Sequence, residues 1–401
     1  MSQLRARRFA VGVLASVVML ANPIIVPAVA ATSTDRVTSH AAPRGAGGVG
    51  GALLVRVHGG STDEQLGRQF NAAGAVEVGR LDAIGVRVVT VAPGRDRAAV
   101  RAALMAAGIV VSVEDDGSGT VALTPDDPLW HNQWSARRVR APQAWDITTG
   151  DGGPIIAIID SGVWAGHPDL EGRVLAGRDL VNDDRNAADD NGHGTLVAGV
   201  AAARGMNGKG VAGTCWRCRI LPVKVIDSHG RVRWSNAAAG VIWATDRGAQ
   251  VINMSFGDQS ASSALAAAVA YAVNRGVVVV AAAGNDGRTA RFYPASYPGV
   301  LGVAATNSSD SLYSWSNRGS WVKLAAPGCT WTTSRGGGYT SFCGTSAAAP
   351  IVAGIAGLML SVAPGASATQ VRSALRSSAV HVTSKIGGGR VDALAAINEI
   401  R

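Results

Sequence analysis

From about residue 126 onward, short β-branched apolar runs alternate with alanine-rich stretches of helical character. The expected strands cover residues 154–159, 220–226, 251–255, 277–282, 300–305 and 322–325, and the expected helices cover residues 198–203, 235–247, 262–274 and 347–360. Nearly unbroken apolar strands separated by helices are typical of a parallel sheet covered on both faces. The pattern predicts a doubly wound α/β domain with a mainly parallel sheet.

A second, smaller pattern precedes this domain. Strand-like runs cover residues 52–57, 74–79, 85–91 and 109–114, and helical stretches cover residues 62–73 and 96–107. This β-α-β-β-α-β order is the split-βαβ signature. Residues 123–128 (LTPDDP) contain the turn formers of a boundary, so we expect domains over 52–122 and 123–401. Residues 31–51, rich in Ser, Thr, Ala, Gly and Pro, are expected to form a linker.

Residues 1–30 have the three parts of a secretory signal peptide. Arg5, Arg7 and Arg8 are a basic segment, residues 9–25 are an apolar run, and residues 28–30 (AVA) form a small-x-small cleavage site. The alternative is an uncleaved membrane anchor. Export predicts a secreted, extracellular protein in an oxidising compartment, where the four cysteines would be paired.

A second charge-free stretch covers residues 346–368. Its length alone is compatible with a membrane span. However, Pro350 lies near its start and small residues dominate, and a helix that is apolar all round is equally typical of the buried centre of a large domain. We therefore expect a core helix and no membrane anchor after processing.

Composition excludes several protein classes. With 47% hydrophobic and 16% charged residues, the chain is not disordered, and four cysteines in 401 residues do not make a disulfide-dense scaffold. The formal charge of +9 raises the possibility of nucleic acid binding. The arginines are scattered, however, and no nucleic-acid motif is present, so we expect a solvated surface property and no nucleic acid partner.

Polar residues lie where several expected strands and helices meet. Asp160 ends one apolar run, Ser255 ends another and Asn285 follows a third, while His193 and Ser346 each lie at the start of a helical stretch. In open α/β sheets, ligands bind at the carboxyl ends of the strands. All five side chains are therefore expected to converge at one edge of the sheet.

These residue types match an acid–base relay. Asp160 would orient His193, and His193 would take a proton from the hydroxyl of Ser346. The developing oxyanion would be stabilised by the Ser346 backbone N–H and the Asn285 amide. Each motif alone also has an ordinary interpretation as a turn, loop or helix cap. The prediction rests on their agreement in order, element type and sheet edge.

The segments that carry these residues are 158–163 (IIDSGV), 191–195 (NGHGT), 281–285 (AAAGN) and 344–350 (GTSAAAP). Together they resemble the subtilisin-like serine proteases, or subtilases, whose triad follows the order Asp, His, Ser. The resemblance covers residues 126–400 and implies a serine endopeptidase acting on proteins through an acyl-enzyme. A catalytically silent binding module and a membrane-tethered processing protease are the alternatives. Ala347, Ala349 and Leu196 depart from the usual pattern without removing a catalytic group.

The resemblance also implies a role for the smaller domain. Residues 52–122 would be an inhibitory prosegment that assists folding, and the enzyme would be a self-processed zymogen and a monomer. Cleavage is expected between about Ser118 and Asp127. The alternative is a permanent accessory domain.

Residues 253–257 (NMSFG) resemble the edge that pairs with an extended substrate, and Ser255, Phe256 and Gly257 are expected to bind it. Phe292 is expected at the floor of the pocket for the side chain before the scissile bond. A ring there would shorten the pocket and favour small or medium apolar side chains. Asp286, next to Asn285, would instead favour basic ones.

Two clusters resemble calcium sites of thermitase-type subtilases: Asp127, Asp169 and Asn207 form the first, and Asp179, Asn182 and Asp184 form the second. Calcium prefers several oxygens, including backbone carbonyls, which residues 205–211 could supply. The alternative for the second cluster is a solvated acidic loop. The resemblance therefore implies structural calcium and no catalytic cofactor.

Cys215 and Cys218 have the C-x-x-C spacing of redox or zinc sites. A tetrahedral zinc site would require this pair to meet Cys329 and Cys343. In an exported chain we expect two disulfides, Cys215–Cys218 and Cys329–Cys343. The second would brace the loop that enters the helix of Ser346.

Overall fold

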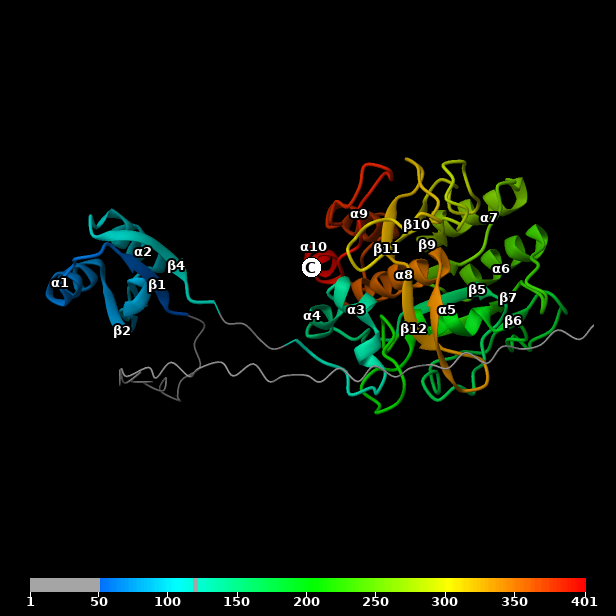
Figure 1. Cartoon of the computed structure of the whole chain (residues 1–401), viewed down its shortest axis with the longest axis horizontal. Helices are drawn as coiled ribbons and strands as arrows, with labels where there is room; N and C mark the ends of the chain where they lie inside the picture. Colours follow the sequence, from blue (N-terminus) through cyan, green and yellow to red (C-terminus); the bar gives the residue numbers. More distant parts are fainter. Residues whose placement is uncertain (1–50, 118–121) are drawn as a thin grey trace, which may run out of the picture. The chain divides into compact units, whose positions relative to one another are not determined.

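The computed structural model describes residues 51–117 and 122–401 (Figure 1). The predicted signal peptide, nearly all of the predicted linker and part of the predicted cleavage segment lie outside these residues. The chain divides into two compact units between residues 119 and 120.

The smaller unit has the predicted β-α-β-β-α-β order. Its elements are β1 (Leu53–Val57), α1 (Asp63–Ala73), β2 (Ala75–Leu81), β3 (Val86–Val91), α2 (Arg97–Ala106) and β4 (Val110–Asp115), with a short 3-10 turn at Asp82–Ile84. The four strands form an antiparallel sheet in the order β2-β3-β1-β4. Leu53, Leu66, Phe70 and Leu104 fill its core, while β2 exposes Val76 and Val78.

The larger unit is built on a seven-stranded sheet in the order β11-β10-β9-β8-β5-β7-β6. Its strands are β5 (Ile155–Asp160), β6 (Arg178–Asp179), β7 (Arg219–Lys224), β8 (Val251–Met254), β9 (Val278–Ala282), β10 (Val300–Thr306) and β11 (Leu324–Pro327). Every neighbouring pair is parallel. The predicted doubly wound parallel sheet is therefore confirmed.

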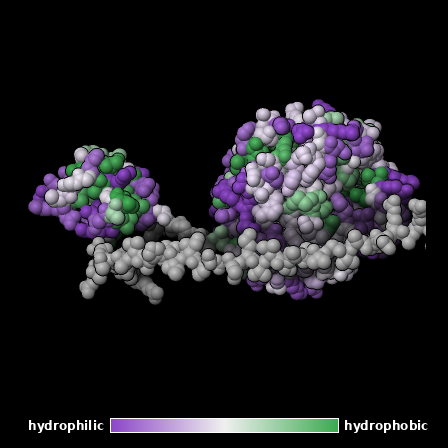
Figure 2. Space-filling model, viewed as in Figure 1, coloured by the Kyte–Doolittle hydropathy of each residue, from purple (hydrophilic) through white to green (hydrophobic). Residues whose placement is uncertain are grey.

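Helices cover both faces of this sheet (Figure 1). One face packs against α5 (His193–Ala202) and α8 (Thr345–Val362), with α9 (Ala368–Ser377) and α10 (Ala393–Ile400) beyond them. The other packs against α6 (Trp234–Asp246) and α7 (Ser263–Asn274). The outer surface of this unit is mainly polar or neutral on the side seen in Figure 2, with small apolar patches.

Helix α8, drawn in orange in Figure 1, contains most of the charge-free stretch for which the sequence analysis weighed a membrane span against a core helix. Among the described helices it alone is long and apolar enough to cross a membrane, but 89% of its apolar window is buried inside the protein. It packs against α5 and strands β8 to β11. The expectation of a core helix is confirmed.

Several elements were not predicted. These are η2 (Trp130–Asn132), α3 (Trp134–Arg138), α4 (Ala141–Trp145), the edge strand β6, helices α9 and α10, and a hairpin of β12 (Cys329–Thr333) and β13 (Tyr339–Cys343). The hairpin is polar and threonine-rich, so it lacks the apolar run by which the sheet strands were found. It packs along α5, where Thr332 Oγ1 donates to the carbonyl of Leu196 at 2.8 Å.

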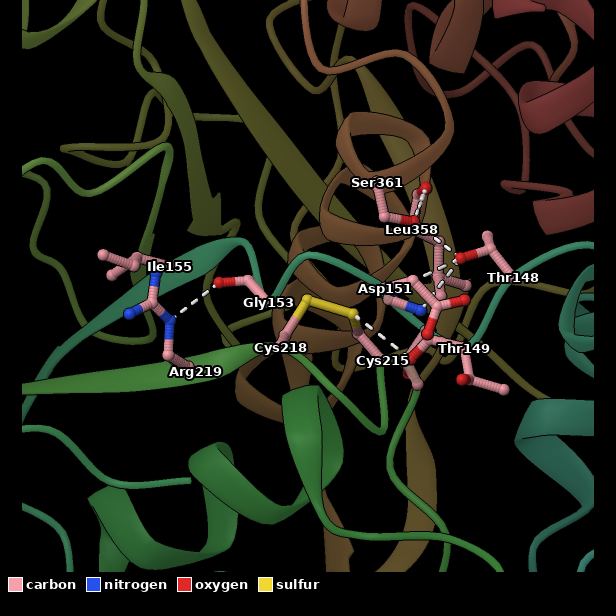
Figure 3. Close-up of a disulfide and its surroundings, with 12 residues drawn as sticks. Thr148, Thr149, Asp151, Gly153, Ile155, Cys215, Cys218, Arg219, Leu358 and Ser361 are labelled. Atoms are coloured by element: carbon pink, nitrogen blue, oxygen red, sulfur yellow. Dashed lines mark hydrogen bonds between the residues drawn. A yellow bond between two sulfur atoms is a disulfide. The ribbon is translucent and has the colours of Figure 1, made fainter. Parts of the chain in front are cut away.

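Both predicted disulfides are present. Cys215–Cys218 is fully buried at the start of β7, beside the loop of Thr148 and Thr149 (Figure 3). Cys329–Cys343 joins the directly paired residues at the open end of the β12–β13 hairpin. With all four sulfurs in disulfides, no thiolate is available for zinc, and the zinc alternative is wrong.

Candidate active site

The predicted site residues converge at the carboxyl edge of the large sheet. Asp160 is the last residue of β5, Ser255 directly follows β8 and Asn285 follows β9 by three residues. Strands β5 and β8 are neighbours, and the strand order changes direction between them. Such a switch point opens a crevice outside the strand ends.

His193 is the first residue of α5, and its ring meets Asp160. The ring Nδ1 lies 2.8 Å from Asp160 Oδ1, which also accepts the backbone N–H of Ser161 at 2.7 Å. Burial lowers the pKa of His193, but the charge and hydrogen bond of Asp160 raise it more, so this pKa lies above its usual value near 6.5. Asp160 is fully buried, and its Oδ2 has no hydrogen-bond partner.

Glycine at position 194 allows this approach. Helix α5 packs so closely on the turn after β5 that a Cβ at Gly194 would overlap the carbonyl of Gly162. The absent side chain brings the first turn of α5, and with it His193, against the end of β5.

Ser346 is the second residue of α8 and is partly exposed. Its Oγ donates to the carbonyl of Ser255 at 3.0 Å, and the Ser255 hydroxyl donates back to the carbonyl of Ser346 at 3.2 Å. The hydroxyl thus lies at a helix N-terminus, where the backbone amides create a positive field. In this structure it is bonded to the end of β8 and not to His193.

The orientation of the Asn285 amide is fixed by Thr345. Asn285 Oδ1 accepts both the backbone N–H and the hydroxyl of Thr345, each at 2.9 Å. Thr345 Oγ1 in turn accepts the backbone N–H of Gly284 at 3.0 Å. Because Oδ1 is used in this way, Nδ2 is the atom through which the Asn285 side chain can donate to a ligand.

A cleft of about 640 Å³ lies along this edge. The predicted substrate residues Ser255, Phe256, Gly257, Asp286 and Phe292 all line it, together with Asn285 and Ser346. The Phe292 ring packs so closely on Gly257 and Gly284 that a Cβ at either would contact it. The cleft is therefore narrowed by an aromatic ring.

The first predicted calcium cluster contains a buried carboxylate oxygen without a partner. Asp127 Oδ2 accepts the N–H of Met206 at 2.9 Å, whereas its Oδ1 has no hydrogen-bond partner. Asp169 is fully buried and accepts Asn207 Nδ2 at 3.0 Å and the N–H of Val211 at 2.9 Å. Burial, and then the charge of Asp169, raise the pKa of Asp127 to about 6.

The second cluster is internally satisfied. Asp179 Oδ1 accepts the N–H groups of Val181 and Asn182, and its Oδ2 accepts Asn182 Nδ2 at 2.9 Å. Asp184 Oδ1 accepts the N–H of Asn186 at 2.8 Å. These bonds supply donors from the loop itself, so this cluster does not require a cation. Within residues 51–117 and 122–401, no three His, Cys, Asp or Glu side chains gather as a metal site.

Five residues of the site were missed from sequence: Ser161, Asp189, Lys224, Asn317 and Thr345. Lys224 Nζ is buried and donates to the carbonyls of Ser161 and Ile226 and to Asp190. Asn317 Oδ1 accepts the N–H groups of Asp286 and Arg288, which holds the loop after β9. Thr345 and Ser161 were within the recognised segments, but their bonds are to residues far along the chain.

Comparisons with known proteins identify the family of this chain. Residues 151–394 match the model of the subtilase family. Thermitase of Thermoactinomyces vulgaris is 45% identical over 286 residues, which are 68% of this chain and 99% of that protein. A thermophilic serine proteinase of Bacillus sp. (strain AK1) is 38% identical over 333 residues, 82% of each chain.

Among solved structures, a protease from Pseudoalteromonas arctica PAMC 21717 superimposes with a TM-score of 0.65 at 32% identity. The match covers 70% of this chain and 100% of that one. The family match exceeds half of the chain, and the fold agrees with it. The chain therefore belongs to the subtilase family of serine endopeptidases.

Proposed function

We propose that this enzyme cleaves proteins through Ser346 as nucleophile, His193 as general base and then acid, and Asp160 as the group that orients His193. The observation that carries the proposal is the 2.8 Å bond between His193 Nδ1 and Asp160, made at the same edge where Ser346 and Asn285 line the cleft. Bonded through Nδ1, the ring keeps Nε2 as the atom that accepts the hydroxyl proton.

In the reaction, Ser346 Oγ attacks the peptide carbonyl carbon as its proton passes to His193. The carbonyl oxygen becomes an oxyanion, which accepts hydrogen bonds from the Ser346 N–H and from Asn285 Nδ2. As one of the first amides of α8, the Ser346 N–H has no acceptor within its helix. His193 then gives the proton to the leaving amine, and a water molecule, deprotonated in the same way, hydrolyses the acyl-enzyme.

Substrate binding also prepares the nucleophile. The Ser346 hydroxyl is bonded to the carbonyl of Ser255 in the free enzyme. An extended peptide that pairs with residues 255–257 brings its own N–H to that carbonyl. A carbonyl oxygen can accept both donors, and we expect the second donor to weaken the bond that holds the hydroxyl, so that the hydroxyl can turn toward His193.

Labelling with a fluorophosphonate serine probe tests the mechanism. Mature wild-type protein should be labelled, and the Ser346→Ala variant should not. Absence of label on a folded, mature wild type, or label that persists in the variant, would exclude Ser346 as the nucleophile.

The narrowed cleft predicts small or medium apolar side chains before the scissile bond, because the Phe292 ring occupies its wall. A peptide library measures the preference. Phe292→Ala should shift it toward larger side chains, and Asp286→Asn should leave it unchanged. Selectivity for basic residues that disappears in Asp286→Asn would assign the preference to Asp286 instead.

We also propose that the enzyme is made as a secreted precursor, with residues 1–30 as signal peptide and 52–122 as inhibitory prosegment. The β2 strand of the smaller unit exposes Val76, Val78 and Leu81, an apolar surface of the kind that a partner covers. The backbone of the larger unit is hydrogen-bonded to the rest of that unit almost from its first described residue, since the Leu123 N–H donates to Asp146 at 2.8 Å. Amino-terminal sequencing of active secreted protein should give a start between about residues 118 and 127. A start near residue 31 with full activity contradicts the proposal.

For structural calcium, the donor set favours the first cluster. The unpartnered buried oxygen of Asp127 and the carboxylate of Asp169 suit a hard cation, which would tie the 205–211 loop to the start of the domain. Excess chelator should lower the melting temperature of wild type and of Asp184→Asn, but not of Asp127→Asn. A chelator response that disappears in Asp184→Asn and persists in Asp127→Asn would reverse the assignment.

A further inference from the structure

Asp189, in the loop that leads into α5, is a buried carboxylate saturated with hydrogen bonds. Only 6% of the surface of Asp189 is exposed. Oδ1 accepts the Ser161 hydroxyl at 2.8 Å and the N–H groups of Asn191 at 3.1 Å and Gly192 at 2.7 Å. Oδ2 accepts the N–H of Thr195 at 2.9 Å and its hydroxyl at 2.6 Å.

These donors lie on both sides of His193 in the chain. Gly192 precedes His193 and Thr195 follows it by two residues, so one carboxylate fixes the backbone that carries the ring. The Ser161 hydroxyl, while donating to Asp189, accepts the N–H of Gly194 at 2.9 Å. Ser161 in turn donates its own N–H to Asp160, which joins the two acids through a single residue.

We propose that Asp189 is a positioning residue of the reaction, an inference that rests on the function proposed above. Asp189 holds His193 against Asp160 and places a second negative charge near the ring. The charge is not neutralised locally. In the described part of the chain Asp189 makes no salt bridge, and its five donors are neutral hydroxyl and amide groups.

The other charges around the ring are engaged elsewhere. Lys224 of β7 bonds to Asp190, and Arg335 of the β12–β13 turn donates to the backbone carbonyl of Asp190. Asp160 of β5 bonds the ring directly. Burial lowers the pKa of His193 and Asp160 raises it, and the charge of Asp189 adds to the increase. The same charge stabilises the imidazolium that forms when His193 takes the Ser346 proton.

The substitution Asp189→Asn tests this role, because it removes the charge and keeps nearly the same shape. The direct readout is the ¹³C NMR titration of His193 in the full chain carrying Ser346→Ala, which does not depend on hydrolysis. His193 should titrate at a lower pH when Asp189→Asn is added. In the enzyme with Ser346 intact, kcat should fall several-fold with little change in KM, and the acidic limb of kcat/KM should move to lower pH.

The matched control is Asp183→Asn, in the same loop. Asp183 is exposed and pairs with Arg178, so its removal changes the net charge equally without touching this network. It should leave the His193 titration in place. Equal shifts in both variants, or an Asp189→Asn variant that only melts at lower temperature with the titration and kcat unchanged, would overturn the proposal.

Ser161→Ala provides a second test should Asp189→Asn not fold. It removes the bridging hydroxyl and keeps both acids, and kcat should again fall several-fold at unchanged KM. An unchanged kcat would overturn the positioning role. If wild type is not labelled by the fluorophosphonate, the proposed function fails, whereas the NMR titration still decides whether Asp189 acts on His193.

Discussion

The two halves of the candidate site are built differently. On the base side, Asp160, His193, Asp189 and Lys224 lie in a dense hydrogen-bond network that joins β5, β7 and α5. On the nucleophile side, the Ser346 hydroxyl is bonded to a backbone carbonyl, and Asn285 Oδ1 accepts the N–H of Thr345. In the proposed mechanism, the charged half of the site is therefore assembled before substrate arrives, and the half that would contact the reacting carbonyl is completed by the substrate.

This difference predicts that substitutions in the two halves of the site affect different measurable properties of the enzyme. Substitutions on the base side should change how His193 titrates, because that side sets the electrostatic environment of the ring. Substitutions on the nucleophile side should change the rate and leave the titration in place. The predictions below test this separation, from the largest expected effect to the smallest.

Ser346→Ala should reduce kcat by about 10⁶-fold, the loss found when a subtilisin nucleophile is removed. Because the Ser346 side chain makes no bond to the base side, the His193 titration of the variant, once it has been processed by added wild-type enzyme, should be the same as in processed wild type. Peptide hydrolysis measures the first effect and histidine NMR the second. A changed titration would show that the two sides are coupled in the free enzyme.

Asp160→Ala should reduce kcat by about 10⁴-fold. It removes the acceptor that fixes the ring through Nδ1 and also lowers the pKa of His193, since Asp160 is the main group that raises it. The variant should still bind the fluorophosphonate probe slowly. A loss no greater than that of Asp183→Asn would mean that the network holds the ring without Asp160.

Asn285→Ala should reduce kcat by about 10² to 10³-fold with little change in KM, as expected for a donor that acts only on the oxyanion. The matched variant is Asn285→Asp, which retains an oxygen for Thr345 and lacks the N–H donor. Both should lose activity while His193 titrates normally. An Asn285→Asp variant as active as wild type would assign Asn285 only to holding α8.

In the wild type, kcat/KM should fall about tenfold per pH unit on the acidic side. His193 must be neutral to accept the proton, and its pKa is raised above 6.5, so the decline begins above that pH. Activity is therefore retained above the raised pKa and lost below it. If kcat/KM begins to fall only well below pH 6.5, the charges of Asp160 and Asp189 do not raise the pKa of His193.

The sheet and the convergence of Asp160, His193, Asn285 and Ser346 at its edge could be predicted because they follow from local patterns. Apolar runs specify buried parallel strands, and a polar residue after each run lies at the same edge. His193 was expected where a helical stretch begins, but the range given for that helix began only at residue 198, whereas α5 begins at His193. Glycines 194 and 199 lower the helix propensity of its first turns, and tight packing against neighbouring backbone compensates for that loss.

The roles of Asp189 and Asp190 could not be predicted. Two adjacent aspartates look equivalent in sequence, but one accepts five bonds around His193 and the other pairs with Lys224. The difference arises from residues that are far apart in the chain and meet only in the fold. The same is true of Asn317, whose bonds hold the loop after β9.

The Cys329–Cys343 bond has a consequence for the lifetime of the enzyme. In a solution of this protease each molecule is also a substrate for the others, and exposed glycine-rich turns such as residues 334–338 are preferred sites of nicking. A single cut in that turn leaves both new ends joined through the disulfide and through the β12–β13 ladder. The chain that enters α8 stays attached to its neighbours, so we expect Ser346 to remain in position after the damage.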